Sequence, residues 1–268
     1  MRPVKPERRA YCFTLDDNIR FLEESSKSAL ASVFQHPYME LFWRMHQKYG
    51  AKFQFNMYYS YEPGGFSLAE VPDRWKEELE ENAQWLRFSF HARHNDPPFP
   101  YAHSSSRDLL KDYTDVMTQL RRIAGKAATD ATTTLHYVCA TREACAALQS
   151  RGMRGLIGMF LPEQDRAALR YYLTEEQSAW LRRYPLCCDE DTRLIFAKND
   201  VVLNSVPLEE IEPALRRIPK DFYHIMIHEQ YFYPDYCNWQ PDFSQKVEAP
   251  LKLFQEMGLP SCFLEEII

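Results

Sequence analysis

Glycine is scarce in this sequence, which has only 8 Gly among its 268 residues. Proteins that bind nucleotides on an open α/β sheet use closely spaced glycines, in G-x-G-x-x-G or P-loop patterns, to bring the backbone close to phosphate groups. Neither pattern occurs here. The scarcity of glycine therefore counts against a nucleotide-binding sheet.

Paired cysteines are also missing. The seven Cys residues include no C-x-x-C pair, which excludes the spacing of a zinc ribbon or a thioredoxin motif. The adjacent Cys187 and Cys188 are expected to be two ordinary reduced thiols in a strand rather than a vicinal disulfide.

The sequence has neither a long apolar run nor an excess of positive charge. No stretch reaches the roughly 18 apolar residues that a membrane helix needs, and the N-terminal MRPVKPERRA is charged. Lys and Arg number 32 against 38 Asp and Glu, for a net charge of -6, so no basic field is present to hold a phosphate backbone. We expect a soluble, cytoplasmic protein with neither a nucleic-acid nor a membrane partner.

What the sequence does contain is a regular alternation of strand and helix patterns. The expected strands cover residues 11–18, 51–62, 86–91, 131–140, 155–160, 222–228 and 261–264. The expected helices cover residues 19–27, 37–49, 71–85, 105–124, 142–150, 175–184, 208–217 and 241–257. Strands separated by helices predict an α/β fold with a parallel sheet, and we favour a closed or nearly closed (β/α)7-8 barrel formed by residues 1–268 as one domain.

The alternation is less regular between residues 161 and 205. Residues 192–196 and 201–203 have strand composition and flank Lys198-Asn199-Asp200, a turn-like tripeptide. We therefore predict a β-hairpin inserted into the barrel, around residues 186–205.

The first expected strand, YCFTLDDN, ends on two adjacent carboxylates, Asp16 and Asp17. Two adjacent carboxylates repel each other, so the pKa of one of them should rise. A cation or a hydrogen-bond donor that neutralises one carboxylate would prevent this rise. Such a difference in pKa provides one base and one ligand. One Asp could instead cap the helix that begins near Ile19, but capping does not explain both.

Other polar side chains lie at equivalent positions, near the C-terminal ends of strands, where barrel enzymes carry their active sites. His91 ends the third strand, His136 lies in the second half of the fourth, and His228 ends strand 222–228. A lone His on an apolar strand is more often a satisfied core residue. Three at equivalent strand ends favour a shared functional site.

One Asp, His91 and a further nitrogen or oxygen donor form a normal ligand set for a catalytic divalent ion. The third ligand could be His94 or Asn95, and their spacing from His91 does not decide between them. The alternative is a solvated loop in which Arg93 pairs with Asp96.

Three of these segments resemble motifs of the polysaccharide deacetylase superfamily of carbohydrate esterases. TLDDN resembles the motif T-F-D-D-G, HARHN resembles H-[ST]-x-x-H, and IMIH resembles L-x-H. The resemblance implies a distorted (β/α)7 barrel with Asp16 as general base, His228 as general acid, and Asp17, His91 and Asn95 as metal ligands. Three departures are Asn18 for the motif Gly, Asn95 for the second His, and TLHY in the place of R-P-P-x-G.

The implied activity is hydrolysis of an N- or O-acetyl group on a carbohydrate or amino sugar. The implied cofactor is a divalent metal, Zn first, with Co, Ni, Fe or Mn as other possibilities. His136 or Tyr137 could donate to the oxyanion. We also expect Arg93, Tyr137 and Glu229 to contact the substrate.

Two other functions are compatible with the sequence. A glycoside hydrolase would use two carboxylates without a metal, such as Asp16 and Glu229. A non-catalytic sugar-binding or regulatory barrel would have lost its metal, as the Asn at position 95 allows. Metal analysis separates the deacetylase from both.

Overall fold

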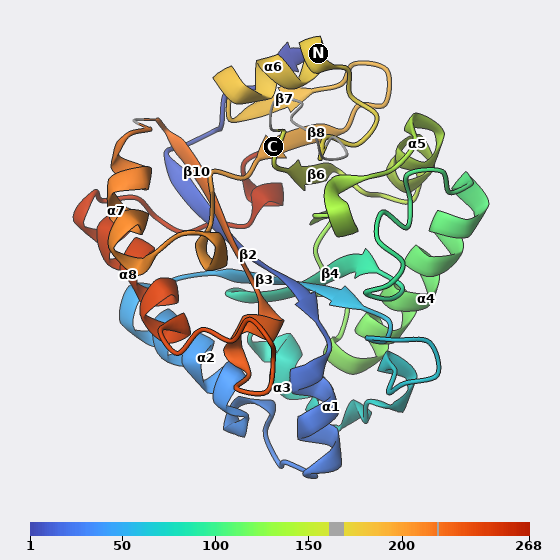
Figure 1. The fold of residues 1–268 in the computed structure, drawn as a ribbon. Coiled ribbons are helices and arrows are strands. Elements are labelled where there is room, and N and C mark those ends of the chain that lie inside the picture. The colour runs from blue at the N-terminus through green and yellow to red at the C-terminus, as the bar shows by residue number, and fades with distance from the viewer. Residues whose placement is uncertain (161–168, 219) are drawn as a thin grey trace.

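The computed structural model describes residues 1–160, 169–218 and 220–268 (Figure 1). Its strands are β1 (Arg2–Pro3), β2 (Ala10–Asn18), β3 (Phe53–Tyr58), β4 (Leu86–Ala92), β5 (Thr132–Thr133), β6 (Gly155–Gly158), β7 (Leu186–Cys188), β8 (Ile195–Lys198), β9 (Val201–Val202) and β10 (Phe222–His228). Its α-helices are α1 (Arg20–Lys27), α2 (Pro37–Tyr49), α3 (Lys76–Glu81), α4 (Ser106–Ala124), α5 (Arg142–Ser150), α6 (Glu175–Arg183), α7 (Leu208–Arg216) and α8 (Phe243–Glu256). The predicted alternation of strands and helices is therefore largely confirmed.

The strands form two sheets of five strands each. One sheet has the order β4-β3-β2-β10-β9, and all of its strand pairs are parallel. The other has the order β1-β7-β8-β6-β5 and contains two antiparallel pairs, β1 with β7 and β7 with β8. The α/β class and the parallel sheet are confirmed.

The two sheets meet where β4 lies beside the segment that precedes β5, without joining into one continuous ladder. There the Phe88 amide donates to the Ala128 carbonyl at 2.8 Å, and Phe88 forms an isolated parallel bridge with Thr129. The described strands therefore do not form the closed barrel that the sequence led us to expect.

The predicted hairpin forms from different strands. Strand β7 pairs with β8, and Cys188 lies opposite Ile195. Strand β9 pairs instead in parallel with β10 of the other sheet. Lys198-Asn199-Asp200 thus connects the two sheets and is not a hairpin turn, while residues 161–168, at the start of the irregular region, lie outside the described residues.

Two other expected strands are much shorter than predicted. Strand β5 covers only Thr132–Thr133, because the chain turns into a short 3-10 helix, His136–Val138. Tyr137 and Val138 have left-handed φ angles of 57° and 50°, which a continuing strand does not allow. The C-terminal strand is reduced to one bridge between Tyr11 and Ser261.

Strand β2 is buried along its whole length. Tyr11 and Phe13 belong to the main apolar core, and the Tyr11 ring stacks on Phe254 of α8 at a centroid distance of 4.4 Å. Cys12 belongs to a second apolar cluster with Ile157 of β6, in the other sheet. Because both faces of β2 are covered, the two carboxylates at its C-terminal end are held away from water.

Strand β10 lies beside β2 and brings its own C-terminal end to the same place (Figure 1). Its residues Ile225 and Ile227, which share one face of the strand by its period of two, belong to the main core. In the register of the pair, His228 lies opposite Asp16.

None of the described helices combines the length and the apolar composition that crossing a membrane would require.

Candidate metal centre

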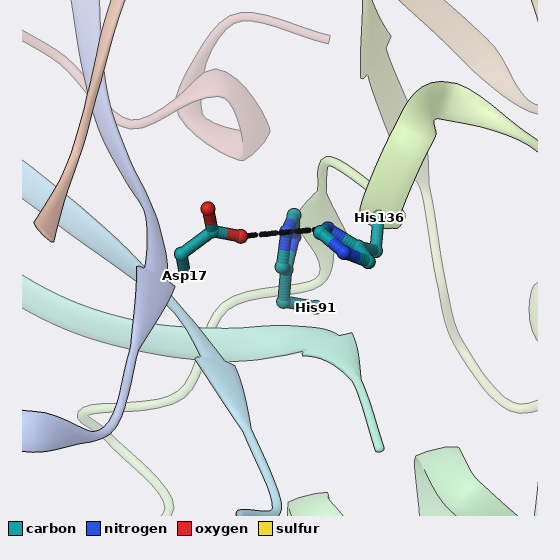
Figure 2. A group of neighbouring side chains, drawn as sticks. All are labelled: Asp17, His91 and His136. Carbon is teal, nitrogen blue, oxygen red and sulfur yellow. Dashed lines mark hydrogen bonds and ion pairs between the residues drawn. The ribbon is translucent and has the colours of Figure 1, made fainter. Parts of the chain in front are cut away.

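Three side chains from distant parts of the chain meet near the C-terminal ends of β2, β4 and β5 (Figure 2). Asp17 Oδ1 lies 3.0 Å from His91 Nε2 and 3.4 Å from His136 Nδ1. The two ring nitrogens are 3.1 Å apart. All three residues are buried, so the group is a compact ligand set of one oxygen and two nitrogens.

Two β-bulges explain why these side chains converge. In the β2–β3 pair, Leu15 lies opposite Phe55 and Asn18 opposite Met57, which leaves an extra residue in β2 where the two Asp residues stand. Asp17 there has a left-handed φ of 64°, which Asp tolerates better than most residues. A bulge redirects a side chain that would otherwise point to the opposite face.

The second bulge lies in β4. Met57 of β3 pairs with Phe90 and Tyr58 pairs with Ala92, so His91 has no opposite residue. A bulge thus flanks β3 on each side, one at Asp17 and one at His91. A regular strand pattern in the sequence does not reveal such irregularities.

The ring nitrogens that face away from the group are held by backbone carbonyls. His91 Nδ1 lies 2.5 Å from the Thr134 carbonyl oxygen, and His136 Nε2 lies 2.9 Å from the Asn95 carbonyl oxygen. A ring N–H donated to a carbonyl leaves the other nitrogen free as a ligand, as in metal-binding histidines generally. This arrangement fits a divalent metal.

The adjacent carboxyls of Asp16 and Asp17 have pKa values shifted in opposite directions. Burial raises the pKa of Asp16, and the nearby His91 and His228 and the hydrogen bond from Asn56 only partly oppose the rise. Burial also acts on Asp17, but hydrogen bonds from His136 and His91 outweigh it and hold that pKa well below its usual range. A difference between the two pKa values was predicted from the repulsion between the carboxyls, but burial is the larger cause of the raised pKa of Asp16.

Neither of the two third ligands considered from the sequence belongs to this group of three. The Asn95 side chain donates to Asp96 at 3.1 Å, and its amide oxygen accepts a 3.3 Å hydrogen bond from the Tyr58 hydroxyl. His94 Nδ1 lies 2.9 Å from the Ser60 hydroxyl. His136, which we expected within a strand, completes the group from the 3-10 helix after β5.

The candidate substrate residues Arg93 and Tyr137 have different surroundings. Arg93 forms ion pairs with Asp112 and Asp115 of α4, at 3.3 and 2.8 Å. These contacts replace the pairing with Asp96 that the alternative interpretation of this loop proposed. Tyr137 is 39% exposed, and its ring lies 4.5 Å from the His136 ring. Of the two, Tyr137 is therefore placed next to the candidate metal centre.

The imidazole of His228 is oriented by Asn204. Its Nδ1 lies 2.9 Å from the Asn204 side-chain oxygen, which also accepts the His228 backbone N–H at 3.2 Å. Because the amide oxygen can only accept, Nδ1 carries a proton. The half-buried ring is close enough to Asp16 and Asp17 to contribute to lowering the pKa of each.

The Glu229 side chain accepts hydrogen bonds from backbone N–H groups at the start of helix α1. Its carboxylate accepts the backbone N–H groups of Ile19 and Phe21, each at 2.7 Å, and that of Arg20 at 3.1 Å. It also accepts the Tyr233 hydroxyl at 2.7 Å. These contacts satisfy donors at the helix N-terminus, so a role of Glu229 in contacting substrate or as a glycosidase carboxylate would compete with them.

The stability of the protein should depend on pH through Glu229. Burial raises the pKa of its carboxyl from 4.5 to about 7, although its hydrogen bonds lower it. A carboxyl with a raised folded-state pKa contributes stability that is present below the unfolded pKa and is lost as the pH rises through the folded one. Between about pH 5 and pH 8 the free energy of unfolding, relative to that of Glu229→Gln, should fall by roughly 2–3 kcal/mol.

Urea unfolding of both proteins at the two pH values measures this difference. The Gln side chain does not titrate, so subtraction removes the contribution of every other group. A difference that stays constant over this pH range would contradict the prediction.

A cavity of about 480 Å³ opens beside the candidate metal centre and is lined by Asp17 itself. Aromatic side chains in its lining are Tyr61, Phe66 and Tyr236. Flat aromatic faces beside polar groups suit the binding of a small ring-shaped ligand. The cavity therefore offers room for a substrate next to Asp17, one of the three converging side chains.

Sequence reasoning missed Tyr58. It is fully buried at the end of β3, and its hydroxyl contacts Asp17 and His136. The available signal was its place at the end of a predicted strand, between two strands that end in candidate ligands. Because a Tyr in an aromatic-rich strand usually belongs to the core, that signal is weak.

No protein-family model matches this chain, and no curated protein sequence matches it. Solved structures do match this chain. The peptidoglycan N-acetylglucosamine deacetylase Bc1960, in complex with 4-naphthalen-1-yl-N-oxidanyl-benzamide, has a TM-score of 0.53 and 10% sequence identity, with 100% of this chain and 91% of that chain covered. A family 4 acetyl xylan esterase from Clostridium thermocellum, in complex with a cobalt ion, has a TM-score of 0.54 and 12% identity, with 96% and 88% covered.

These similarities show that this chain has the fold of those two structures, over nearly its whole length although few residues are identical. The fold agrees with the resemblance that the three sequence motifs suggested.

Proposed function

We propose, from this fold and the group of Asp17, His91 and His136, that the protein is a metal-dependent hydrolase that removes acetyl groups from a carbohydrate or amino sugar. The observation that carries the proposal is the convergence of three buried ligand atoms at the ends of parallel strands. A large cavity adjoins them. We further propose that the two sheets form an open, distorted (β/α)7-8 barrel.

The donor set supports a metal. One carboxylate and two imidazoles with an open position are typical of a catalytic Zn²⁺ site, and imidazole also suits Fe, Co and Ni. A bound ion of this kind polarises a carbonyl group and lowers the pKa of a water molecule. In this proposal His136 takes the place that the motif comparison gave to Asn95.

The other residues of the site would move protons. Asp16, buried and held by a 2.6 Å hydrogen bond from Asn56, would take the proton of the attacking water. His228, with Nδ1 fixed by Asn204, would donate a proton from Nε2 to the departing amine or alcohol. Because His136 Nδ1 serves as a ligand, Tyr137 remains as the candidate donor to the oxyanion.

The substrate class rests on the named neighbours and on the cavity. The two solved structures are a peptidoglycan N-acetylglucosamine deacetylase and an acetyl xylan esterase. The cavity beside Asp17 has the aromatic lining that sugar rings use for stacking. An N-acetylated amino sugar and an O-acetylated sugar are therefore the two substrates to compare.

Protein purified without a His-tag should contain a stoichiometric divalent metal and release acetate from N-acetylglucosamine oligomers or acetylated xylan. A chelator should remove the metal and abolish acetate release, because the ion polarises the reacting carbonyl. Addition of Zn²⁺ or Co²⁺ should restore it. Elemental analysis and an acetate assay on the same samples provide the measurement.

The alternatives give different results. A glycoside hydrolase would shorten an oligosaccharide without releasing acetate and would not respond to the chelator. A non-catalytic barrel would bind oligosaccharide and release nothing from either substrate with any of the metals. Either result would remove the proposal.

A further inference from the structure

Strand β3 carries two buried amide side chains on one of its faces. Gln54 and Asn56 lie two residues apart, so they point to the same side of the strand, whereas Phe53 and Phe55 point to the main apolar core on the other side. Gln54 is 2% and Asn56 is 0% exposed. Each amide therefore needs hydrogen-bond partners within the protein.

The two amides form an unbroken series of hydrogen bonds that ends at the proposed general base. Gln54 Nε2 donates to the carbonyl oxygen of Thr132 in β5 and to Asn56 Oδ1, each at 2.8 Å. Asn56 Nδ2 in turn donates to Asp16 Oδ1 at 2.6 Å. The series thus crosses the interior from β5, through β3, to the end of β2.

One backbone carbonyl sets the direction of every bond in this series. A side-chain amide keeps nearly the same shape when its oxygen and nitrogen are exchanged, so its partners decide its orientation. The Thr132 carbonyl can only accept, which requires the Gln54 nitrogen beside it. Because that nitrogen also donates to Asn56, Asn56 must turn its oxygen to Gln54 and its nitrogen to Asp16.

Thr132 is itself held by a buried carboxylate. Its backbone N–H donates to Asp130 Oδ1 at 2.8 Å, and Asp130 forms an ion pair with Arg87 at 3.2 Å. The Thr132 hydroxyl lies 3.0 Å from Gln54 Oε1 and 2.7 Å from Asp130 Oδ1. Since this hydroxyl has one hydrogen for two acceptors, the carbonyl and not the hydroxyl fixes the orientation of Gln54.

We propose that Gln54 is a positioning residue for Asp16, which acts through Asn56 to fix the orientation of the Asp16 carboxylate. The Asn56 nitrogen occupies Asp16 Oδ1, so Oδ2 is the oxygen that remains to take the proton of the reacting water. This role rests on the proposed function, in which Asp16 is the general base.

Gln54→Glu tests this role with almost no change in side-chain shape. A carboxylate at position 54 cannot donate to Asn56, so the Asn56 nitrogen should turn towards it and the Asn56 oxygen should face Asp16. The two facing oxygens repel each other and displace the Asp16 carboxylate. Because a displacement of about 1 Å can cost about 10²-fold in rate, kcat for acetate release from N-acetylglucosamine oligomers should fall by roughly that factor.

Two other quantities should stay unchanged in this variant. Gln54 does not line the cavity beside Asp17, so KM should stay close to that of the parent. It is not one of the three converging ligands, so the affinity for Co²⁺ should also stay. Gln54→Met, which keeps the size but has no donor, should lower kcat in the same way and replaces Gln54→Glu if that variant does not fold.

Thr132→Val is the matched control within the series. It removes the hydroxyl next to Gln54 but keeps the carbonyl that orients it, so kcat should stay close to that of the parent. A double variant tests the route of the effect. In an Asn56→Ala background, Gln54→Glu should cause no further loss of kcat, because residues that act as one unit have non-additive effects.

The outcomes separate this role from the proposed function. A parent protein that releases acetate, with folded Gln54→Glu and Gln54→Met proteins of unchanged kcat, would overturn the role of Gln54 and leave the deacetylase intact. Losses that simply add in the double variant would also overturn it, since Gln54 would then not act through Asn56. A parent protein that binds Co²⁺ but releases no acetate would overturn the proposed function, and this role with it.

Discussion

Replacement of His136 by Ala is expected to abolish tight metal binding. His136 Nδ1 is one of three atoms that converge at the ends of β2, β4 and β5, and its other nitrogen is already held by the Asn95 carbonyl. Loss of an outer-shell partner alone typically costs about 10–100-fold in metal affinity, so loss of the ligand should cost more. Titration of metal-free protein with Zn²⁺ or Co²⁺ measures the affinity.

The chain offers two informative comparisons for this prediction. His94→Ala removes an imidazole that contacts Ser60 and lies outside the group, so it should bind metal as the parent does. Asn95→Ala keeps the backbone carbonyl that holds His136 and should weaken binding much less than His136→Ala. If Asn95→Ala lost the metal while His136→Ala retained it, the ligand set implied by the motif comparison would be correct instead.

The ligands that could be predicted from the sequence are those that end a strand of clear pattern. Asp17 and His91 lie at the C-terminal ends of the buried strands β2 and β4, and parallel strands bring their C-terminal ends to one edge. His136 was predicted as a donor to the oxyanion and not as a ligand, and it was expected within a strand. The left-handed pair Tyr137 and Val138 ends that strand early, and a backbone of this kind in non-glycine residues leaves little trace in a sequence.

The pairing of strands into sheets was also difficult to predict from the sequence. Helix and strand patterns depend on neighbours within a few residues, so the α/β class and the elements around the site could be predicted. Closure of a barrel depends on pairing between segments far apart in sequence. Here Val202 of β9 pairs with Met226 of β10, 24 positions further along the sequence, and β9 does not pair with the neighbouring β8. Local turn composition at residues 198–200 could not show this.

Replacement of His228 by Ala is expected to lower turnover on an N-acetylated substrate by roughly 10²–10⁴-fold, the usual contribution of a general acid. The ring lies across from Asp16 in the register of β2 and β10. Its Nδ1 is hydrogen-bonded to Asn204, so Nε2 is the ring nitrogen that remains for proton donation. Metal content and melting temperature should stay close to those of the parent, because the side chain is half-buried and is not one of the three ligands.

A comparison of leaving groups tests the chemical role of His228. An amine must be protonated to leave, whereas 4-nitrophenolate leaves readily without a proton. His228→Ala should therefore lose most of its activity on an N-acetylated amino sugar and little on 4-nitrophenyl acetate. His103→Ala, which removes an exposed imidazole from a loop, should alter neither rate.

A positioning role would give another pattern. If His228 only ordered the end of β10 through Asn204, its loss would disturb the site for every substrate, and both rates would fall together with the melting temperature. Equal losses of rate on the amide and on the activated ester would thus show that His228 has a structural role. A loss confined to the amide would place a proton on Nε2 at the moment when the carbon–nitrogen bond breaks.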